Sequence, residues 1–195
     1  MNSYIPRNVK LIREKQKNLE ESIRKVLHQM AEMIRMENGA CYTEIHFKML
    51  ENELEKMAIW AYEERNNTLR SDNQYFIKYV EMRKNQSFVL KKLYKNMHLL
   101  HSVPKQAIEI AQYIEEVSRT FHEYNNVEVL ERQLNGILEK MKQEPMPVTR
   151  EEFENRAVLY RILYDLEEFL QIKIQFIVSL TKEEIEHFWN DEADS

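Results

Sequence analysis

Glycine and proline are scarce in this sequence: its 195 residues include two Gly and four Pro. Folds built from β-strands, or from alternating strands and helices, need more of both residues in their turns. The sequence is instead rich in Glu, Lys, Leu, Met and Gln, which favour helices. It therefore predicts an all-α fold, and its length suits a single domain with a substantial core.

Cysteine and long apolar runs are also lacking. Cys41 is the single cysteine, so no disulfide can form within the chain, as is usual in a reducing compartment. No stretch of about 18 apolar residues could span a bilayer, and no secretory signal is recognisable. We therefore expect the chain by itself to be a soluble piece of protein.

No familiar arrangement of catalytic residues is present. The sequence has no Gly-rich phosphate loop and no nucleophile elbow, and Cys41 has no base beside it in sequence. A diiron bundle needs Glu-x-x-His on two helices, whereas this chain has one such pair, Glu184 with His187. We therefore expect no catalytic residue, no cofactor and no metal site, and a metal-dependent bundle enzyme is the least favoured alternative.

The charge argues against general nucleic-acid binding, because 28 Lys and Arg face 33 Asp and Glu. The segment from Arg7 to Lys25 is nevertheless basic, with seven Lys or Arg against three Glu. The end of the chain, from Glu183 to Asp194, is acidic. The basic segment suits anionic lipid head groups, although a solvated helix face is the more ordinary explanation.

Apolar residues recur every three or four positions along most of the chain, a period typical of amphipathic helices. Short connections force neighbouring helices to run antiparallel. The sequence therefore predicts an antiparallel bundle of four long helices plus one or two shorter ones. The long helices are expected over residues 8–37, 44–66, 72–101 and 150–180, and the shorter ones over 104–121 and 129–141.

The first predicted helix carries a seam of residues with heptad spacing, as in a coiled coil. The seam could pack inside the domain or join two copies of the chain, and the sequence does not decide between them. Its members are Val9, Ile12, Gln16, Leu19, Ile23, Val26, Met30 and Met33.

Capping residues mark several predicted helix starts. Thr149 and Thr181 each precede a Glu by three residues, the spacing of a capping box, and Thr43 is a candidate cap for the second helix. The box at Thr181 favours a separate short helix that ends near Trp189. We expect residues 1–195 to form one helical-bundle domain in which residues 181–195 are a short helix and a tail.

Charged residues also fall among the apolar positions of two predicted helices. Arg83 follows Val80 by three residues on the buried side of the third helix, and Glu167 lies among the apolar residues of the last one. A buried charge needs a partner of opposite sign. The sequence therefore predicts an ion pair of Arg83 with Glu167 or Glu168, which would fix the register of the helices.

A ligand site is the alternative explanation of the same residues. Arg83 would receive the carboxylate of an organic acid in a pocket lined by aromatic rings. Tyr160 and Tyr164 on the last helix are the candidate rings, with Glu167 beside them.

Several segments resemble the carboxy-terminal domain of the putative aromatic acid exporter family of bacterial membrane proteins. The likeness extends from about Val9 to Ile174. The segments that carry it are Thr149–Ala157 (TREEFENRA), Asp165–Leu170 (DLEEFL), Ile23–Ala31 (IRKVLHQMA), Tyr79–Arg83 (YVEMR) and Pro104–Ala107 (PKQA).

The resemblance implies a domain on the cytoplasmic side of the bacterial cell membrane, in a protein whose amino-terminal half carries several membrane-spanning helices. Residues 1–7 would link the domain to that half, and the basic first helix fits the positive-inside tendency of cytoplasmic flanks. The implied partners are the membrane-spanning half, a second copy of the chain and a small aromatic acid. We expect a role in assembly, gating or ligand sensing without catalysis, and a freestanding helical binding or regulatory protein is the alternative.

Overall fold

A computed structural model describes residues 7–35, 40–67, 72–122, 124–125 and 127–189. These residues form helices and connections without a strand, which confirms the predicted all-α fold. The helices are α1 (Arg7–Ile34), α2 (Ala40–Asn67), α3 (Asp72–Met97), α4 (Lys105–Arg119), α5 (Glu128–Gln143), α6 (Arg150–Ser179) and α7 (Lys182–Phe188).

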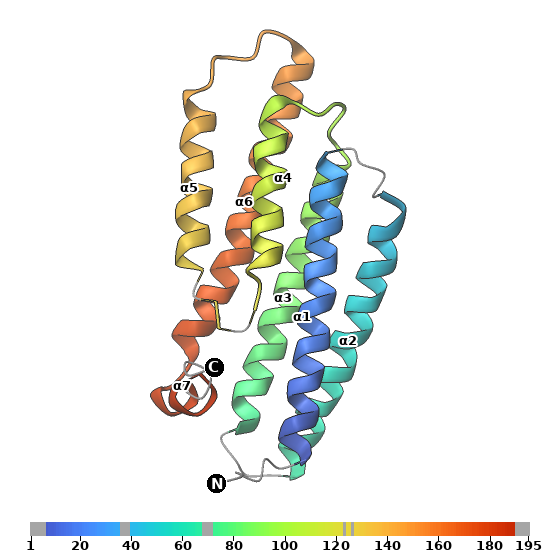
Figure 1. Ribbon diagram of the computed structural model, residues 1–195, viewed down its shortest axis with the longest axis vertical. Coiled ribbons are helices and arrows are strands. Elements are labelled where there is room, and N and C mark those ends of the chain that lie inside the picture. The colour runs from blue at the N-terminus through green and yellow to red at the C-terminus, as the bar shows by residue number, and fades with distance from the viewer. Residues whose placement is uncertain (1–6, 36–39, 68–71, 123, 126, 190–195) are drawn as a thin grey trace.

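The helices from α1 to α6 run alternately up and down the long axis of the molecule (Figure 1). Packing is most extensive between α3 and α6, between α1 and α2 and between α1 and α4, and the helices α1, α3, α4 and α6 lie between α2 and α5. The long helix α2 covers α1 and α3 on one side, and α5 covers α4 and α6 on the other. The short α4 therefore holds a central place, whereas the longer α2 is lateral.

The heptad seam of α1 packs inside the domain. Ile12, Leu19, Ile23, Val26 and Met30 are fully buried, and the polar member Gln16 is buried with them. Met33 is partly buried against the same core, and the side chain of Val9 lies outside the described residues. The sequence left open whether the seam packs inside the domain or joins two copies. In the structure α1 lies between α2 and α4, and these two helices cover the seam.

Some residues that the sequence assigns to apolar stripes are exposed. On α2 these are Ile45, Met49 and Tyr62, and on the shorter helices they are Ile108 and Val129. The lateral helices α2 and α5 meet the core along a narrow face, so only the middle of a broad apolar stripe on them is covered.

The helix boundaries differ from the predicted ones at several ends. α2 begins at Ala40, so Thr43 lies within the helix and does not cap it. α3 ends at Met97, four residues before the predicted end at His101. The short helix α7 lies where the sequence predicted a separate short helix after Thr181.

Both predicted capping boxes are present. The Thr149 hydroxyl accepts from the Glu152 backbone N–H at 3.1 Å, and the Glu152 carboxylate accepts from the Thr149 N–H at 3.3 Å. The backbone N–H groups of Val148 and Thr149 lower the pKa of Glu152, because both donate to its carboxylate and stabilise the charged form. The equivalent box at Thr181 starts α7, which turns back so that Phe188 stacks on Tyr75 with ring centres 4.1 Å apart.

Gly136 lies within α5, and a Cβ built on it would meet nothing within 4 Å. We expect Gly136→Ala to stabilise the protein by about 0.5–1 kcal/mol, because alanine removes backbone freedom from the unfolded chain. Urea unfolding measures the change. Leu134→Ala on the buried face of the same helix is the control, and it should cost about 2–5 kcal/mol. A loss of stability in Gly136→Ala would contradict the expectation.

Candidate ligand-binding site

Arg83 lies fully buried on α3 at the centre of a polar network. Its Nη2 donates to Oε1 of Glu20 on α1 at 2.8 Å, and its Nη1 donates to Oε1 of Gln86 at 2.9 Å. The Tyr79 hydroxyl donates to the same Glu20 oxygen at 2.9 Å. Gln86 in turn donates from Nε2 to the backbone oxygen of Phe169 at 3.0 Å. The network therefore joins α1, α3 and α6.

The predicted ion pair of Arg83 with Glu167 or Glu168 is wrong, because the carboxylate that Arg83 meets is that of Glu20. Glu168 is exposed and contacts Lys92 at 2.8 Å, while Glu167 is half-buried on α6. Helix periodicity correctly predicted that Arg83 lies on the buried side of α3, but it could not show that α1 is the helix opposite. A signal for Glu20 was available, since it follows the seam residue Gln16 by one helical turn.

The rings near Arg83 also differ from those predicted. The Cζ atom of Arg83 lies 4.9 Å from the ring centre of Tyr79 and 4.3 Å from that of Phe121, distances typical of cation–π contacts. Tyr160 and Tyr164 instead face each other at 6.4 Å, and Tyr164 is 54% exposed. The structure therefore does not bring the two predicted tyrosines to Arg83.

The cavity beside Arg83 is too small for an organic acid. Its volume is about 10 Å³, which is room for one water molecule. Val127 lines it with a φ of 60°, a conformation that β-branched residues rarely adopt. A hydrogen bond from the Val127 N–H to Oδ1 of Asn125, 2.8 Å long, supports this bend. Asn125 and Val127 thus line the small cavity beside the buried network.

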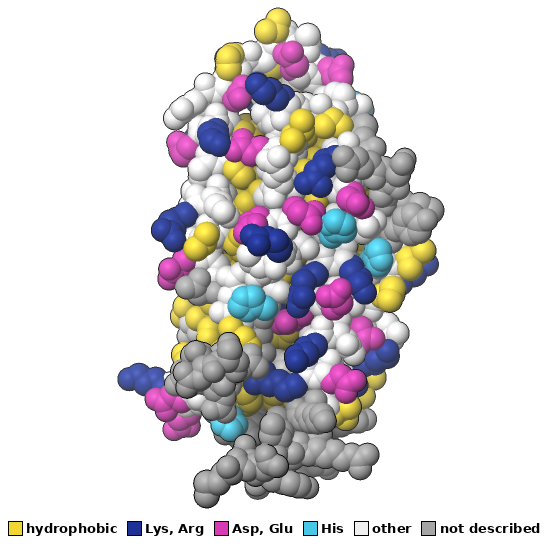
Figure 2. All heavy atoms as spheres, viewed as in Figure 1, with side chains coloured by type: hydrophobic (Ala, Val, Ile, Leu, Met, Phe, Trp, Pro, Cys, Tyr) yellow, Lys and Arg dark blue, Asp and Glu magenta, His cyan; other side chains and the backbone are white. Residues whose placement is uncertain are grey.

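A groove of about 860 Å³ lies directly outside the network, and Glu20 belongs to both. Such a volume falls within the range of small-molecule sites. Figure 2 shows that basic, acidic and histidine side chains mix over the face that α1 and α4 form. The groove is lined by Arg13, Gln16, Lys17, Asn18, Glu20, Glu21 and Arg24 of α1, by His122 and Tyr124 after α4, and by Trp189 after α7.

The balance of charge in this groove is positive. Arg13, Lys17 and Arg24 line it against the single carboxylate of Glu21, because the carboxylate of Glu20 is already neutralised by the buried Arg83. The buried Nε–H of Arg24 has no hydrogen-bond partner in the part of the chain that the structure describes. The guanidinium of Arg24 pairs with Glu21 through Nη1 at 3.4 Å, and the groove as a whole favours an anion.

Arg13 and two aromatic rings shape one end of the groove. Arg13 donates from Nη1 to the Tyr124 hydroxyl at 2.9 Å and to Oε1 of Gln16 at 3.1 Å. The Tyr124 and Trp189 rings meet edge to face at 5.8 Å, and the Trp189 N–H donates to the Tyr75 hydroxyl at 3.1 Å. These rings give the end of a cationic groove an aromatic wall.

His122 stands where the groove meets the buried network. Partial desolvation lowers its pKa below the ordinary value of 6.5; Glu20 opposes that change, while the cations of Lys173, Arg24 and Arg83 add to it. Its Nδ1 also accepts from the Tyr124 backbone N–H at 3.2 Å, which requires the ring nitrogen to be unprotonated. The ring is therefore neutral at pH 7.

The sequence candidates for metal or thiol chemistry occupy other settings. Across the described ranges, no three His, Cys, Asp or Glu side chains converge as a metal site. Glu184, from the Glu-x-x-His pair, is buried and contacts Nζ of Lys78 at 2.8 Å. His187 is exposed and packs against the ring of Phe188, and the side chain of Cys41 lies outside the described residues.

The sequence pattern of one family matches most of the chain. It is described as the putative aromatic acid exporter C-terminal domain, and the match covers residues 10–174. The chain therefore belongs to this family, as its resemblance to the family indicated. None of the described helices is both long and apolar enough to cross a membrane.

Two relatives agree with this membership. The chain is 30% identical over 112 residues to an uncharacterized protein of Bacillus subtilis (strain 168), YqjA, and the match covers 57% of the chain and 34% of YqjA. The chain thus spans about a third of that relative. A crystal structure described as a putative membrane protein from Clostridium difficile 630 superposes with a TM-score of 0.79 at 30% identity. The superposition covers 87% of this chain and 99% of the solved one.

Replacing Arg83 with Met would leave the Glu20 carboxylate buried without its cation. We expect Arg83→Met to lower the free energy of unfolding by about 3–5 kcal/mol, and the double variant with Glu20→Gln to regain most of that loss. Urea unfolding measures both. Arg150→Met, which removes a pair at the exposed start of α6, is the control and should change little. An Arg83→Met protein as stable as this control would contradict the expectation.

The pKa of His122 can be followed by NMR. We expect its titration midpoint below 6.5, and Arg24→Gln should raise it by removing a neighbouring cation. Because the folded state binds this proton more weakly than the unfolded state, acidification from pH 6.5 through the lower midpoint should destabilise the protein. Arg119→Gln, on the exposed end of α4, is the control for general loss of charge. A midpoint that Arg24→Gln leaves unchanged would contradict this electrostatic account.

Proposed function

We propose that this chain is the cytoplasmic ligand-sensing domain of an exporter-like membrane protein. It binds a small aromatic acid in the groove on α1 and passes the state of that groove to a membrane-spanning half, without covalent chemistry. The observation that carries the proposal is a cationic groove with an aromatic wall, close to 860 Å³ in volume, in a chain of this family.

The groove has a counterpart for each part of an aromatic carboxylate. The guanidinium of Arg24, which Glu21 contacts at 3.4 Å, would meet the carboxylate, and Lys17 adds a second positive charge at the groove. Charged hydrogen bonds of this kind are roughly twice as strong as neutral ones. Trp189 and Tyr124 provide faces and edges against which a planar ring can pack. An acid without an aromatic ring would lose the contacts with Trp189 and Tyr124. An aromatic compound without a carboxylate would lose the contacts with Arg24 and Lys17.

The position of the groove supports a role in signalling. Its lining comes mostly from α1, the first helix of a family domain that stands at the carboxy-terminal end of its proteins. A membrane-spanning half would therefore enter the domain through α1. The groove also contacts the connection after α4 and the residue after α7, so a ligand there bridges α1 to the opposite side of the bundle. Binding thus bears directly on the helix that joins the two halves.

The ligand can be tested by calorimetric titration with benzoate, cyclohexanecarboxylate and benzyl alcohol. We expect benzoate to bind, and the other two compounds to bind more weakly because each lacks one half of the recognition. Arg24→Gln should weaken benzoate binding at least about tenfold, since a charged hydrogen bond contributes about 1.5–3 kcal/mol.

Arg119→Gln is the matched control, because this arginine is exposed on α4 outside the groove. Trp189→Ala separately removes the aromatic wall. If benzoate produces neither heat nor a shift in melting temperature, the sensing role is wrong. If Arg24→Gln binds benzoate as tightly as Arg119→Gln does, the site lies elsewhere on the molecule.

A further inference from the structure

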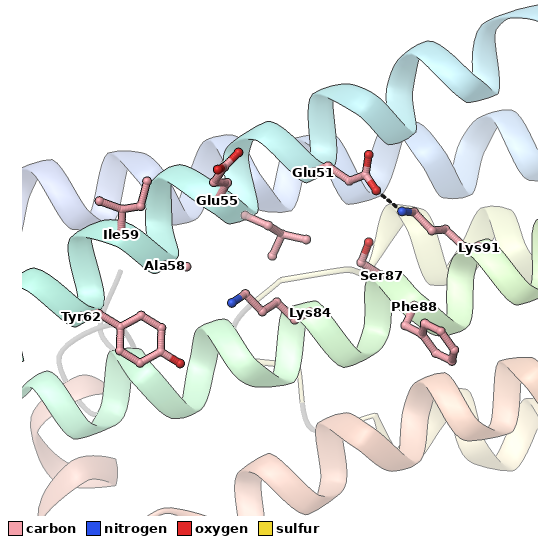
Figure 3. A pocket seen from close by; sticks show the side chains of 10 residues that line it. Glu51, Glu55, Ala58, Ile59, Tyr62, Lys84, Ser87, Phe88 and Lys91 are labelled. Atoms are coloured by element: carbon pink, nitrogen blue, oxygen red, sulfur yellow. Dashed lines mark hydrogen bonds and ion pairs between the residues drawn. The ribbon is translucent and has the colours of Figure 1, made fainter.

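A second groove runs between α2 and α3 and shares no lining residue with the groove on α1 (Figure 3). Its volume is about 680 Å³. Leu54 and Ala58 are buried along it, whereas Ile59 and Phe88 are more than half exposed. Apolar side chains that gather around a hollow in this way are typical of a protein interface.

Phe88 is the most exposed aromatic residue of the described helices, with 69% of its surface open to water. It follows Lys84 by one turn of α3, at the edge of the groove. Neighbouring core residues such as Val89 and Leu90 fill the inward positions of the same turn. Phe88 thus contributes little to the fold of one chain, while its ring is large enough to fill part of a groove on another.

The charges of the groove are divided between its two helices. The α2 side carries the acidic Glu51 and Glu55, and the α3 side carries the basic Lys84 and Lys91 (Figure 3). Glu51 and Lys91 form an ion pair across the groove, so they lie at the same height along the helices. The groove therefore has an acidic side on α2 and a basic side on α3.

This division is self-complementary under a twofold axis that runs parallel to the two helices. Rotation about such an axis keeps the height of every residue and places α2 of one copy opposite α3 of the other. The acidic side of each groove then meets the basic side of the other, and the Glu51–Lys91 pairs of the two copies come together. Because α2 and α3 are antiparallel, Phe88 of each copy lies near the height of Leu54 and Ala58 of the other.

We propose that a second copy of this chain occupies the α2–α3 groove and forms a symmetric dimer in which each Phe88 seats in the groove of its partner. Closed twofold dimers of this kind use the same surface on both subunits. The heptad seam is not available for self-association, because α1 buries it within the domain. The proposal does not depend on the ligand of the α1 groove.

Light scattering coupled to size-exclusion chromatography tests the dimer, on the full 195-residue chain and without added ligand. We expect a mass of twice 23.8 kDa. Phe88→Glu should give the monomer mass with an unchanged helical content by circular dichroism. Phe153→Glu is the matched control, because Phe153 is a similarly exposed phenylalanine on α6, and it should remain dimeric. Lys91→Glu should weaken the dimer at least tenfold, and adding Glu51→Lys should restore it.

A monomer at every concentration up to the millimolar range would overturn the proposal and leave the groove to the membrane-spanning half. A dimer that survives Phe88→Glu would overturn it equally, since the copies would then meet through another surface. Benzoate titration of the monomeric Phe88→Glu variant separates the two proposals: retained binding shows that the sensing site is independent of the dimer.

Discussion

The pairing of Arg83 with Glu20 is the constraint on which the bundle and its groove depend. Removing two charges from water costs several kcal/mol for each ion, so such a pair persists only where further contacts satisfy both partners. Here Tyr79 and Gln86 complete the hydrogen bonds, and the ring of Phe121 covers the guanidinium. A slip of α1 by one turn along α3 would leave both charges buried and unpaired. The pair therefore selects a single register more than it adds stability.

The same pair sets the electrostatics of the α1 groove. Glu20 would make the groove floor acidic if it were not held by Arg83. With that charge compensated, Arg13, Lys17 and Arg24 outweigh Glu21 in the groove. Partial desolvation, together with the cations of Lys173, Arg24 and Arg83, lowers the pKa of His122 beside it. Val127 lies beside Arg83 in the small cavity. His122 and Tyr124, a few residues before it, line the groove. A buried structural contact thus determines what kind of ligand the surface can attract.

Much of the fold could be predicted because helix periodicity and capping are local. The seam of α1 and the boxes at Thr149 and Thr181 depend on residues a few positions apart. The partner of Arg83 could not be predicted, because periodicity shows which side of a helix is buried but not which helix covers it. Exposed residues such as Ile45 have the same origin, since the lateral place of α2 depends on the whole bundle. The groove combines α1 with residues beyond positions 120 and 180, which only the packing brings together.

The α1 groove and the α2–α3 groove are connected through α3. Arg83 faces inward to Glu20, while the next residue, Lys84, faces outward into the α2–α3 groove. Coupling between two sites requires an element with two arrangements that each site favours differently. The Arg83–Glu20 pair ties α3, which lines the α2–α3 groove, to α1, which lines most of the other groove.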